Sequence, residues 1–351
     1  MYKLLPFSCK ITVKKTTEVR VYRNYLAVKE FNMKTSIVLI LLLTIQQSIL
    51  AQACCTAGTP LLGSLEMSTT KKGAWQLGLN YEYNSLTKVY EGNSELIDRT
   101  RERVSQSILL EVSYGLTSRI TLTTMLSFIN QLRKVDPLSG QNNTLNSNGI
   151  GDLILLAKYS LINLNFVNQQ ELAVGLGVKA PTGKSEVRED GILVPADMQP
   201  GTGAWDGILW AYYSRANLLN IPMNLLVNLS YRFNGTNKRF GSNFSTYKFG
   251  NEFISTVGLS YFTGSLVDPT LFLRYRNTRS DQFSSGDIPN TGGDWLYIVP
   301  GMNINLAENL ILRTSGQIPI YRNLIGTQLT TTFTTSVSIQ YIISASNPLG
   351  I

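Results

Sequence analysis

Apolar and polar residues alternate along most of the chain after residue 72. The segment 223–233 shows the pattern most clearly, with an apolar residue at every second position. In 328–341, one set of alternate positions is apolar apart from Thr331 and Thr335, and the other set is polar. A period of two is typical of strands that have one apolar and one polar face. Outside residues 37–44, apolar residues do not recur with a helical period for longer than a turn or two. The pattern therefore predicts an all-β chain.

The alternating segments predict about twelve strands, each about ten residues long. They span residues 73–84, 103–114, 119–130, 151–162, 169–180, 204–214, 223–234, 247–261, 269–279, 295–305, 310–320 and 328–342. Every second connection is short, whereas most of the others are long and polar, such as residues 85–102, 131–150 and 181–203. An even number of such strands, with short turns on one side and long loops on the other, indicates a transmembrane antiparallel up-and-down β-barrel of a Gram-negative outer membrane.

A soluble sandwich or jelly roll would also alternate, but it would not separate short and long connections so regularly. In an outer-membrane barrel the short turns face the periplasm, so both termini are expected there and the long loops outside. Tyrosines near predicted strand ends are candidates for the aromatic girdles at the two membrane interfaces: Tyr83, Tyr114, Tyr159, Tyr231, Tyr261 and Tyr341.

Residues 177–184, Gly-Val-Lys-Ala-Pro-Thr-Gly-Lys, resemble a phosphate-binding loop at first sight. A Walker loop needs four residues between its glycines and a helix after its lysine. Here five residues separate Gly177 from Gly183, and the charged residues that follow have no helical period. The stretch is better explained as the end of a strand that runs into a loop at Pro181.

Residues 33–53 have the form of a secretory signal peptide, with Lys34 before an apolar run and small residues at Ala51 and Ala53. The prediction is that residues 1–32 are a mis-called upstream extension, that residues 54–72 are periplasmic, and that the barrel spans 73–343 before a tail at 344–351. Residues 1–34 contain eight Lys/Arg and two Glu, which leaves about +2 of the net charge of +8 for the rest. This balance does not suggest a nucleic-acid partner.

Cys54 and Cys55 directly follow the predicted signal peptide, and the other cysteine of the chain is Cys9. No disulfide framework is available from this set. Three roles stay open for the adjacent pair: a plain N-terminal tether, a site of lipid attachment, or a vicinal disulfide or soft-metal site.

Charged residues on the polar face of the predicted strands should point into the lumen. They are Glu82, Glu111, Lys158, Glu171, Lys179, Arg232, Glu252, Arg274, Arg276 and Arg313. Glu252 lies on a strand between those of Arg232 and of Arg274 and Arg276, so an inter-strand ion ladder is expected at mid-height. Such a ladder would either satisfy buried charges and stiffen the wall, or leave surplus cations that favour anions in a pore.

The chain contains no histidine, which excludes Ser-His-Asp hydrolysis, His-dependent barrel phospholipases and His-ligated zinc. Isolated carboxylates in a wet lumen usually pair with Lys or Arg rather than catalyse a reaction. We expect neither an enzyme nor a cofactor or metal site in the barrel.

Four motifs follow one another along the chain: Gly149-Ile-Gly-Asp152 followed by Lys158-Tyr159, Gly175-Leu-Gly-Val-Lys-Ala-Pro-Thr-Gly183, Gly201-Thr-Gly-Ala-Trp-Asp206 and Gln317-Ile-Pro-Ile-Tyr321. In this order they resemble the outer-membrane barrels of the putative MetA-pathway phenol-degradation family, whose members are often labelled transporters. The resemblance covers about residues 73–341. It implies a porin-like channel for small, hydrophobic or aromatic solutes in the outer membrane, without catalytic residues to carry over.

Residues Ala53-Cys54-Cys55 and the many asparagines and tyrosines are similar to proteins of Bacteroidetes. The expected partners are outer-membrane lipid, the barrel-assembly machinery during insertion, and a solute that the sequence does not identify. The alternative is a structural or adhesion barrel whose own side chains plug the lumen.

Overall fold

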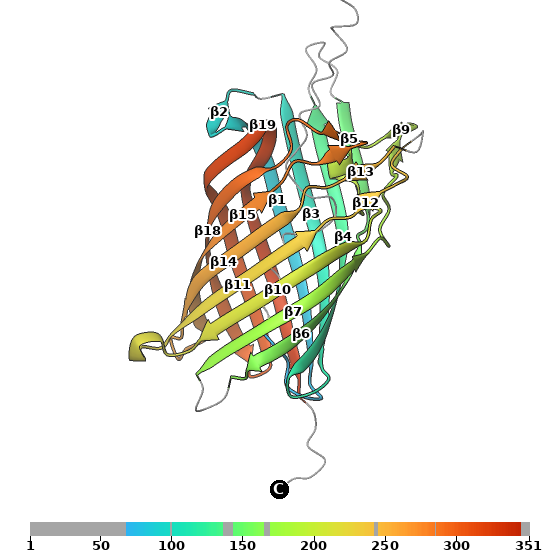
Figure 1. The fold of residues 1–351 in the computed structure, drawn as a ribbon. Helices are drawn as coiled ribbons and strands as arrows, with labels where there is room; N and C mark the ends of the chain where they lie inside the picture. The colour runs from blue at the N-terminus through green and yellow to red at the C-terminus, as the bar shows by residue number, and fades with distance from the viewer. Residues whose placement is uncertain are drawn as a thin grey trace, which may run out of the picture. The chain divides into compact units, whose positions relative to one another are not determined.

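The computed structural model describes residues 68–98, 100–135, 143–164, 169–241, 245–284 and 286–344, which lie within one compact unit. These residues form a closed wall of antiparallel strands (Figure 1). The wall strands are β1 (Trp75–Gly92), β3 (Arg101–Gly115), β4 (Ile120–Val135), β5 (Asn143–Ile150), β6 (Leu153–Ile162), β7 (Gln170–Ala180), β10 (Asp206–Arg215), β11 (Met223–Phe233), β14 (Glu252–Tyr261), β15 (Val267–Thr278), β18 (Gly293–Ala307) and β19 (Leu310–Ile343).

The wall follows chain order, from β1 through β3, β4, β6, β7, β10, β11, β14, β15 and β18 to β19, and β19 closes it by pairing with β1. β5 and β6 pair with successive parts of β4, so together they form one interrupted strand. The first part of the 34-residue β19 pairs with β18, and its second part pairs with β1. A hydroxyl contact of 2.8 Å between Ser315 and Ser336 joins these two parts.

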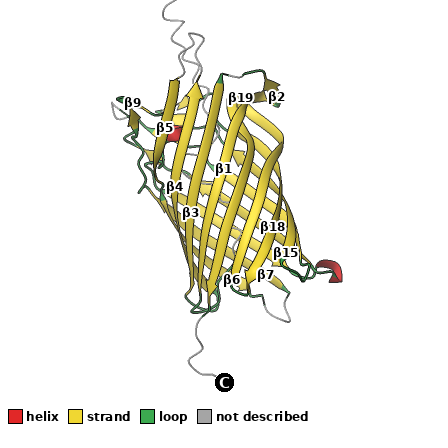
Figure 2. Cartoon of the chain, turned by 180° about the vertical axis from the view of Figure 1, so that it is seen from behind, coloured by secondary structure: helices red, strands yellow, loops and turns green. Residues whose placement is uncertain are grey.

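β19 therefore crosses the wall twice, turning near Gly326, where φ is +70°. Twelve antiparallel passes result, which confirms the predicted up-and-down barrel. We call the end with the short connections the turn end, and the opposite end the loop end. Figure 2 shows the wall from behind, with β19 beside β1.

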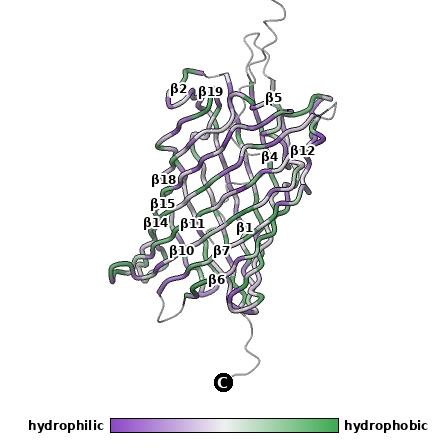
Figure 3. Tube along the Cα trace, viewed as in Figure 1, coloured by the Kyte–Doolittle hydropathy of each residue, from purple (hydrophilic) through white to green (hydrophobic). Residues whose placement is uncertain are grey.

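The outer face of the wall is an apolar belt. Along the wall strands, hydrophobic and hydrophilic residues follow one another (Figure 3), and the large apolar residues at alternate positions are exposed. Examples of the exposed set are Leu79, Ile108, Leu110, Leu122, Leu155, Val174, Leu176, Leu209, Val257, Leu271, Leu273, Ile318, Val337 and Ile339. In lipid, such a face is stable only where the backbone groups are paired internally, which closure provides.

Two levels of aromatic side chains border this belt. Trp75 and Tyr114 lie at the turn end with ring centroids 4.5 Å apart, and Tyr83 packs on Phe333 higher in the wall. Trp75 and Tyr83 are eight residues apart on β1. Eight residues of a strand tilted by about 40° rise about 20 Å, close to the apolar height of about 25 Å in such barrels.

Several strands are longer than predicted at the loop end. β1 continues to Gly92, so Tyr83 is inside the strand rather than at its end, and β4 continues to Val135. Residues 143–150, predicted as loop, form β5. In β1 a register shift at Leu86 breaks the alternation, so Leu86 and Val89, three residues apart, are both buried in one cluster with Leu329, whereas β5 is mostly polar. Alternation therefore does not reveal these extensions.

The loops at the loop end contain short elements of their own. A hairpin strand, β2 (Ser94–Leu96), pairs with β1, and β8 (Arg188–Glu189) pairs with β9 (Ile192–Leu193). A small sheet joins two loops: β12 (Thr236–Asn237), β13 (Tyr247–Lys248), β16 (Gln282–Phe283) and β17 (Gly286–Asp287). The predicted strand 247–261 is thus two elements, β13 and β14.

The described residues also include the short 3-10 helices η2 (Ala196–Met198) at the loop end and η3 (Leu218–Asn220) at the turn end. In the part of the chain that the structure describes, no helix is long and apolar enough to cross a membrane.

Candidate functional site in the barrel interior

Most of the charged residues predicted to face the lumen are buried in the structure. At most 8% of the surface of each of the following is exposed: Glu111, Lys158, Glu171, Lys179, Arg232, Glu252, Arg274 and Arg276. Glu82 and Arg313 line an interior cavity. Buried charges are costly unless they are paired or hydrogen-bonded, so their partners define the interior.

Arg232, Glu252 and Arg276 form one ion-pair cluster across β11, β14 and β15. Arg232 Nη2 lies 2.6 Å from Glu252 Oε2, and Arg276 Nε lies 2.7 Å from Glu252 Oε1. The guanidinium of Arg276 also stacks 5.0 Å from the centroid of Trp295. The cluster lies near the loop end rather than at mid-height, because β11 ends at Phe233 and β14 begins at Glu252.

Arg274 is not part of this cluster. Its Nε donates to Thr256 Oγ1 at 3.2 Å, and its Nη1 donates to Gln317 Oε1 at 2.6 Å. The strand alternation places Arg274 and Arg276 on the same face, but only Arg274 lines the interior cavity.

Three of the sequence motifs meet at Lys179. Its ammonium group lies 2.9 Å from Asp152 Oδ2, 2.6 Å from Asp206 Oδ2 and 2.5 Å from Thr202 Oγ1. Asp152 Oδ1 accepts a hydrogen bond from the backbone N–H of Gly183 at 2.9 Å. The stretch 177–184 is therefore a strand end held to its own loop by a buried lysine, and the glycines permit this close approach.

The long β7–β10 loop folds into the loop-end mouth. We call residues 194–200 the plug segment, in which Val194, Ala196, Asp197, Met198 and Gln199 are each at most 2% exposed. Figure 2 shows its helix η2 in red near β5. Within the loop, Gln199 Oε1 accepts from the N–H of Val187, and its Nε2 donates to the carbonyl of Val194.

The plug segment is bound to the wall through Arg103 on β3. Arg103 Nη1 lies 2.7 Å from Asp197 Oδ2, and its Nη2 donates to the Asp197 carbonyl at 2.5 Å and also to Gln131 on β4. Arg103 and Asp197 are 94 residues apart in the chain. Both are almost fully buried, so this contact closes that side of the mouth without access for bulk water.

Above the mouth, Tyr247 and Phe249 pack against Ala196 of the plug segment. Because Tyr247 belongs to β13, the small sheet is in contact with the plug segment. Tyr247 Oη donates to Asp281 Oδ2 at 2.7 Å, and the N–H of Gly250 donates to Asp281 Oδ1 at 2.8 Å. Burial raises the pKa of the Asp281 carboxyl group to about 6, although both hydrogen bonds oppose the shift.

At the turn end, the chain before β1 crosses the inside of the barrel. Thr69 donates to Glu171 Oε1 on β7 through its N–H at 2.9 Å and its hydroxyl at 2.6 Å. β3, β4 and β6 lie between β1 and β7 in the wall. Thr70 N–H donates to Thr121 Oγ1 at 2.9 Å. We call residues 68–74 the strap. A Cβ at Gly115 would collide with the Lys71 carbonyl, so the strap can pass this close to β3 only because residue 115 is glycine.

Between the two ends, one side of the inner wall is apolar. A single cluster of buried side chains covers β3, β4, β6, β7, β10 and β14: Leu109, Met125, Ile154, Leu156, Ala173, Ile208, Trp210, Tyr212 and Ile254. Trp210 and Tyr212 stack with centroids 5.8 Å apart, and Lys158 Nζ lies 4.8 Å from the Trp210 centroid. Gly175 makes room, since a Cβ there would lie 3.1 Å from Trp210.

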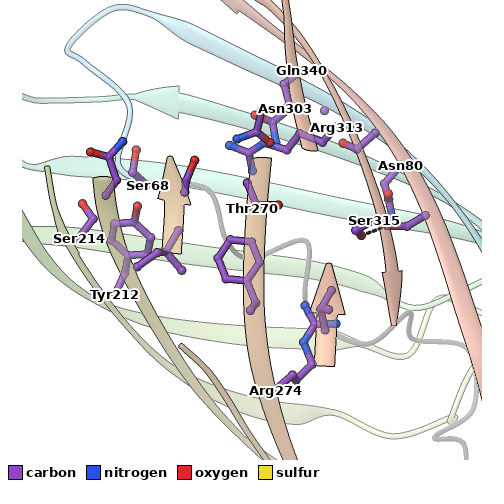
Figure 4. A pocket seen from close by; sticks show the side chains of 18 of the residues that line it. Ser68, Asn80, Tyr212, Ser214, Thr270, Arg274, Asn303, Arg313, Ser315 and Gln340 are labelled. Carbon is purple, nitrogen blue, oxygen red and sulfur yellow. Dashed lines mark hydrogen bonds between the residues drawn. The ribbon is translucent and has the colours of Figure 1, made fainter. Parts of the chain in front are cut away.

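A cavity of about 340 Å³ lies beside this cluster in the turn-end half. Its apolar lining includes Leu109, Tyr212, Leu226, Phe272 and Val299. Its polar lining comes from facing strands and includes Asn80, Glu111, Arg274, Asn303, Arg313, Ser315 and Gln340. Figure 4 shows Tyr212 and Ser214 on one side, Asn80 and Ser315 on the other, and Thr270 between them. Ser68 of the strap lines it as well.

Sequence reasoning missed the plug segment and the apolar inner cluster. A signal for the cluster exists, because residues 153–157 and 208–211 are apolar on both faces, which is typical of strands buried on both sides. Cys54 and Cys55 lie outside the described residues. Among the residues that are described, no group of three or more His, Cys, Asp or Glu could hold a metal ion.

Comparisons with known proteins agree with this architecture. No curated protein matches the chain significantly. A crystal structure of an outer-membrane channel from Pseudomonas putida F1 is similar, with a TM-score of 0.63 and 16% identity over 78% of this chain and 97% of that one. The β domain of the Bordetella autotransporter BrkA gives a TM-score of 0.42 and 12% identity over 78% of this chain and all of that one.

A family model described as "Putative MetA-pathway of phenol degradation" matches residues 114–320, more than half of the chain. This match includes the motifs that meet at Lys179 and most of the apolar inner cluster. The fold is that of an outer-membrane β-barrel, and the chain belongs to this phenol-degradation family.

Proposed function

We propose that the protein is an outer-membrane channel through which small hydrophobic or aromatic solutes pass without an energy source. The observation that carries this proposal is the apolar cluster on the inner wall. Transmembrane barrels usually have a polar, hydrated interior. Here nine buried apolar side chains, among them Trp210 and Tyr212, face inward beside a cavity that is apolar on one side. Such a wall suits an apolar solute better than a sugar or an ion.

The alternative function is a structural or adhesion barrel whose lumen is plugged. The buried plug segment and the turn-end strap support it, because each covers part of one mouth. Passage through the barrel requires at least one of them to move. Neither segment is a strand of the hydrogen-bonded wall, and for this reason we favour movable closures in a channel.

Solute entry into whole cells tests the two functions directly. A Gram-negative host that lacks its own hydrocarbon channels would express the protein, and the initial uptake rate of radiolabelled toluene would be measured. We expect faster uptake than in cells with an empty vector. A Ser336→Trp variant fills the cavity and should abolish the gain.

Val337→Trp provides the matched control, since it adds the same side chain to the next residue, on the lipid-facing side. It should leave uptake unchanged. Equal uptake with and without correctly inserted protein would exclude the channel and favour the plugged barrel. Unchanged uptake in the Ser336→Trp variant would mean that the cavity does not lie on the path.

A further inference from the structure

Glu111 on β3 differs from the other buried carboxylates of the interior. Glu171 accepts two hydrogen bonds from Thr69, and Glu252 binds two arginines. Glu111 is 2% exposed and lines the cavity, yet neither of its oxygens accepts a hydrogen bond of normal geometry from any described residue. The Ser113 hydroxyl is near enough to act on it electrostatically, but its hydrogen-bond geometry is satisfied by Thr123 Oγ1 at 2.8 Å. A buried acceptor without a donor costs about 1–3 kcal/mol, and more when it is charged.

Two cations already offset part of the cost of burying the Glu111 charge. Burial is the larger effect, and Lys158 and Arg313 act against it. Lys158 Nζ lies over the Trp210 ring, and Arg313 lines the same cavity. The Glu111 carboxylate therefore has cations nearby but lacks a hydrogen-bond donor, which a ligand could supply.

The surroundings of Glu111 determine what else that ligand should carry. Leu109 is two residues away on the same face of β3 and belongs to the apolar inner cluster with Tyr212. Phe272 and Leu226 extend the apolar side of the cavity. The volume of about 340 Å³ lies at the small end of the range of about 300–1,000 Å³ for ligand pockets. An apolar body the size of one ring fits this space.

We propose that the cavity selects apolar solutes that carry a neutral hydroxyl group, which donates a hydrogen bond to the Glu111 carboxylate. This inference rests on the proposed channel function and narrows its substrate class. In it, Glu111 determines specificity, and the apolar cluster supplies affinity that does not depend on the hydroxyl. A solute without a donor would enter the same cavity but leave Glu111 unsatisfied.

Binding of four probes with one apolar body tests the inference: toluene, benzyl alcohol, benzylamine and benzoate. Dissociation constants would be measured by titration into the purified full-length protein in detergent, with toluene uptake by cells as a separate readout. A hydrogen bond to a charged group corresponds to a preference for benzyl alcohol over toluene on the order of tenfold. Benzoate should bind most weakly, because its charge repels Glu111.

Glu111→Leu should remove the alcohol preference while the barrel remains folded. Glu111→Gln retains a neutral acceptor and should be intermediate. Glu95→Leu is the matched control, because it removes the same charge from an exposed loop-end hairpin, where Glu95 pairs with Lys88. It should leave the alcohol preference unchanged.

Equal binding of toluene and benzyl alcohol by the natural protein would overturn the inference and leave Glu111 as a structural, hydrated carboxylate. A strong preference for benzylamine would also overturn the inference, because it would show that the site selects a cation rather than a neutral hydroxyl group. Either result would leave the channel intact if cells still took up toluene. Absence of both binding and uptake would instead be a failure of the channel function itself.

Discussion

The two halves of the barrel interior are closed by different kinds of contact. At the loop end, buried ion pairs hold the plug segment and the strand ends: Arg103 with Asp197, Lys179 with Asp152 and Asp206, and Arg232 and Arg276 with Glu252. At the turn end, a strap lies over a cavity and is held by hydroxyl and backbone groups at Glu171 and Thr121.

The difference indicates which half of the barrel contributes most to stability and which half has room for a solute. Breaking a buried ion pair by removing one partner leaves an uncompensated charge and costs about 3–5 kcal/mol, whereas a hydrogen bond to a charged group such as Glu171 is worth about 1.5–3 kcal/mol. We therefore expect stability to depend on the loop-end half and solute selection to depend on the turn-end half. Changes to each half test this division.

The largest effect is expected for Lys179→Met. Asp152 and Asp206 would then be buried carboxylates without their cation, which should lower the free energy of unfolding by about 3–5 kcal/mol. Urea unfolding of the refolded barrel, followed by tryptophan fluorescence, measures it. Lys88→Met is the matched control, because its ion pair with Glu95 is more than 40% exposed and should matter by about 0–1 kcal/mol. Equal losses in the two variants would refute the division between the halves.

A smaller loss of stability, about 1–3 kcal/mol, is expected for the pair Arg103→Met and Asp197→Asn, because both charges are removed together. The plug segment would lose its wall contact at 2.7 Å and move out of the mouth more often. Planar-bilayer recordings should then show a higher conductance than the natural protein. Unchanged conductance would mean that the plug segment does not limit passage.

Arg274 and Arg276 should respond differently although they share a strand face. Arg274→Ala changes the cavity lining and should shift the reversal potential toward cations under a salt gradient. Arg276→Ala removes one of the two partners of Glu252 and should mainly lower the unfolding temperature. If both variants changed selectivity alike, the conducting path would have to include the ion-pair cluster as well as the cavity.

The smallest effect concerns pH and the loop-end cap. Since the pKa of Asp281 is raised from 3.8 to about 6, its contribution to stability is complete below about pH 4 and is lost as the pH rises through 6. Protease cleavage of the small sheet should therefore accelerate between pH 4 and 7. Asp281→Asn should remove this dependence, because an amide can still accept from Gly250 and donate to Tyr247. A pH response that survives the substitution would have to come from another group.

The alternation of residues was sufficient to predict the barrel, because lipid imposes a period of two on every strand that crosses it. The same rule failed at residues 85–92, where register shifts in β1 break the period of two, and at residues 143–150, which are mostly polar. It also placed polar groups throughout the lumen, so Trp210 and its neighbours were missed. The contact of Arg103 with Asp197 joins residues 94 positions apart, and no local pattern encodes such a pair.

The seam between β1 and the end of β19 has a consequence for the order of events during folding. Tyr81 pairs with Val337 and Gln76 with Ile342, so the closing contacts join residues more than 250 positions apart. Non-local pairing of this kind makes folding slow, since a long stretch of chain must be ordered before the contact forms. Until the final pass arrives, β1 presents an open edge that can pair with other chains. A chain truncated near Gly326 would keep that edge permanently, and we expect it to aggregate rather than form a smaller barrel.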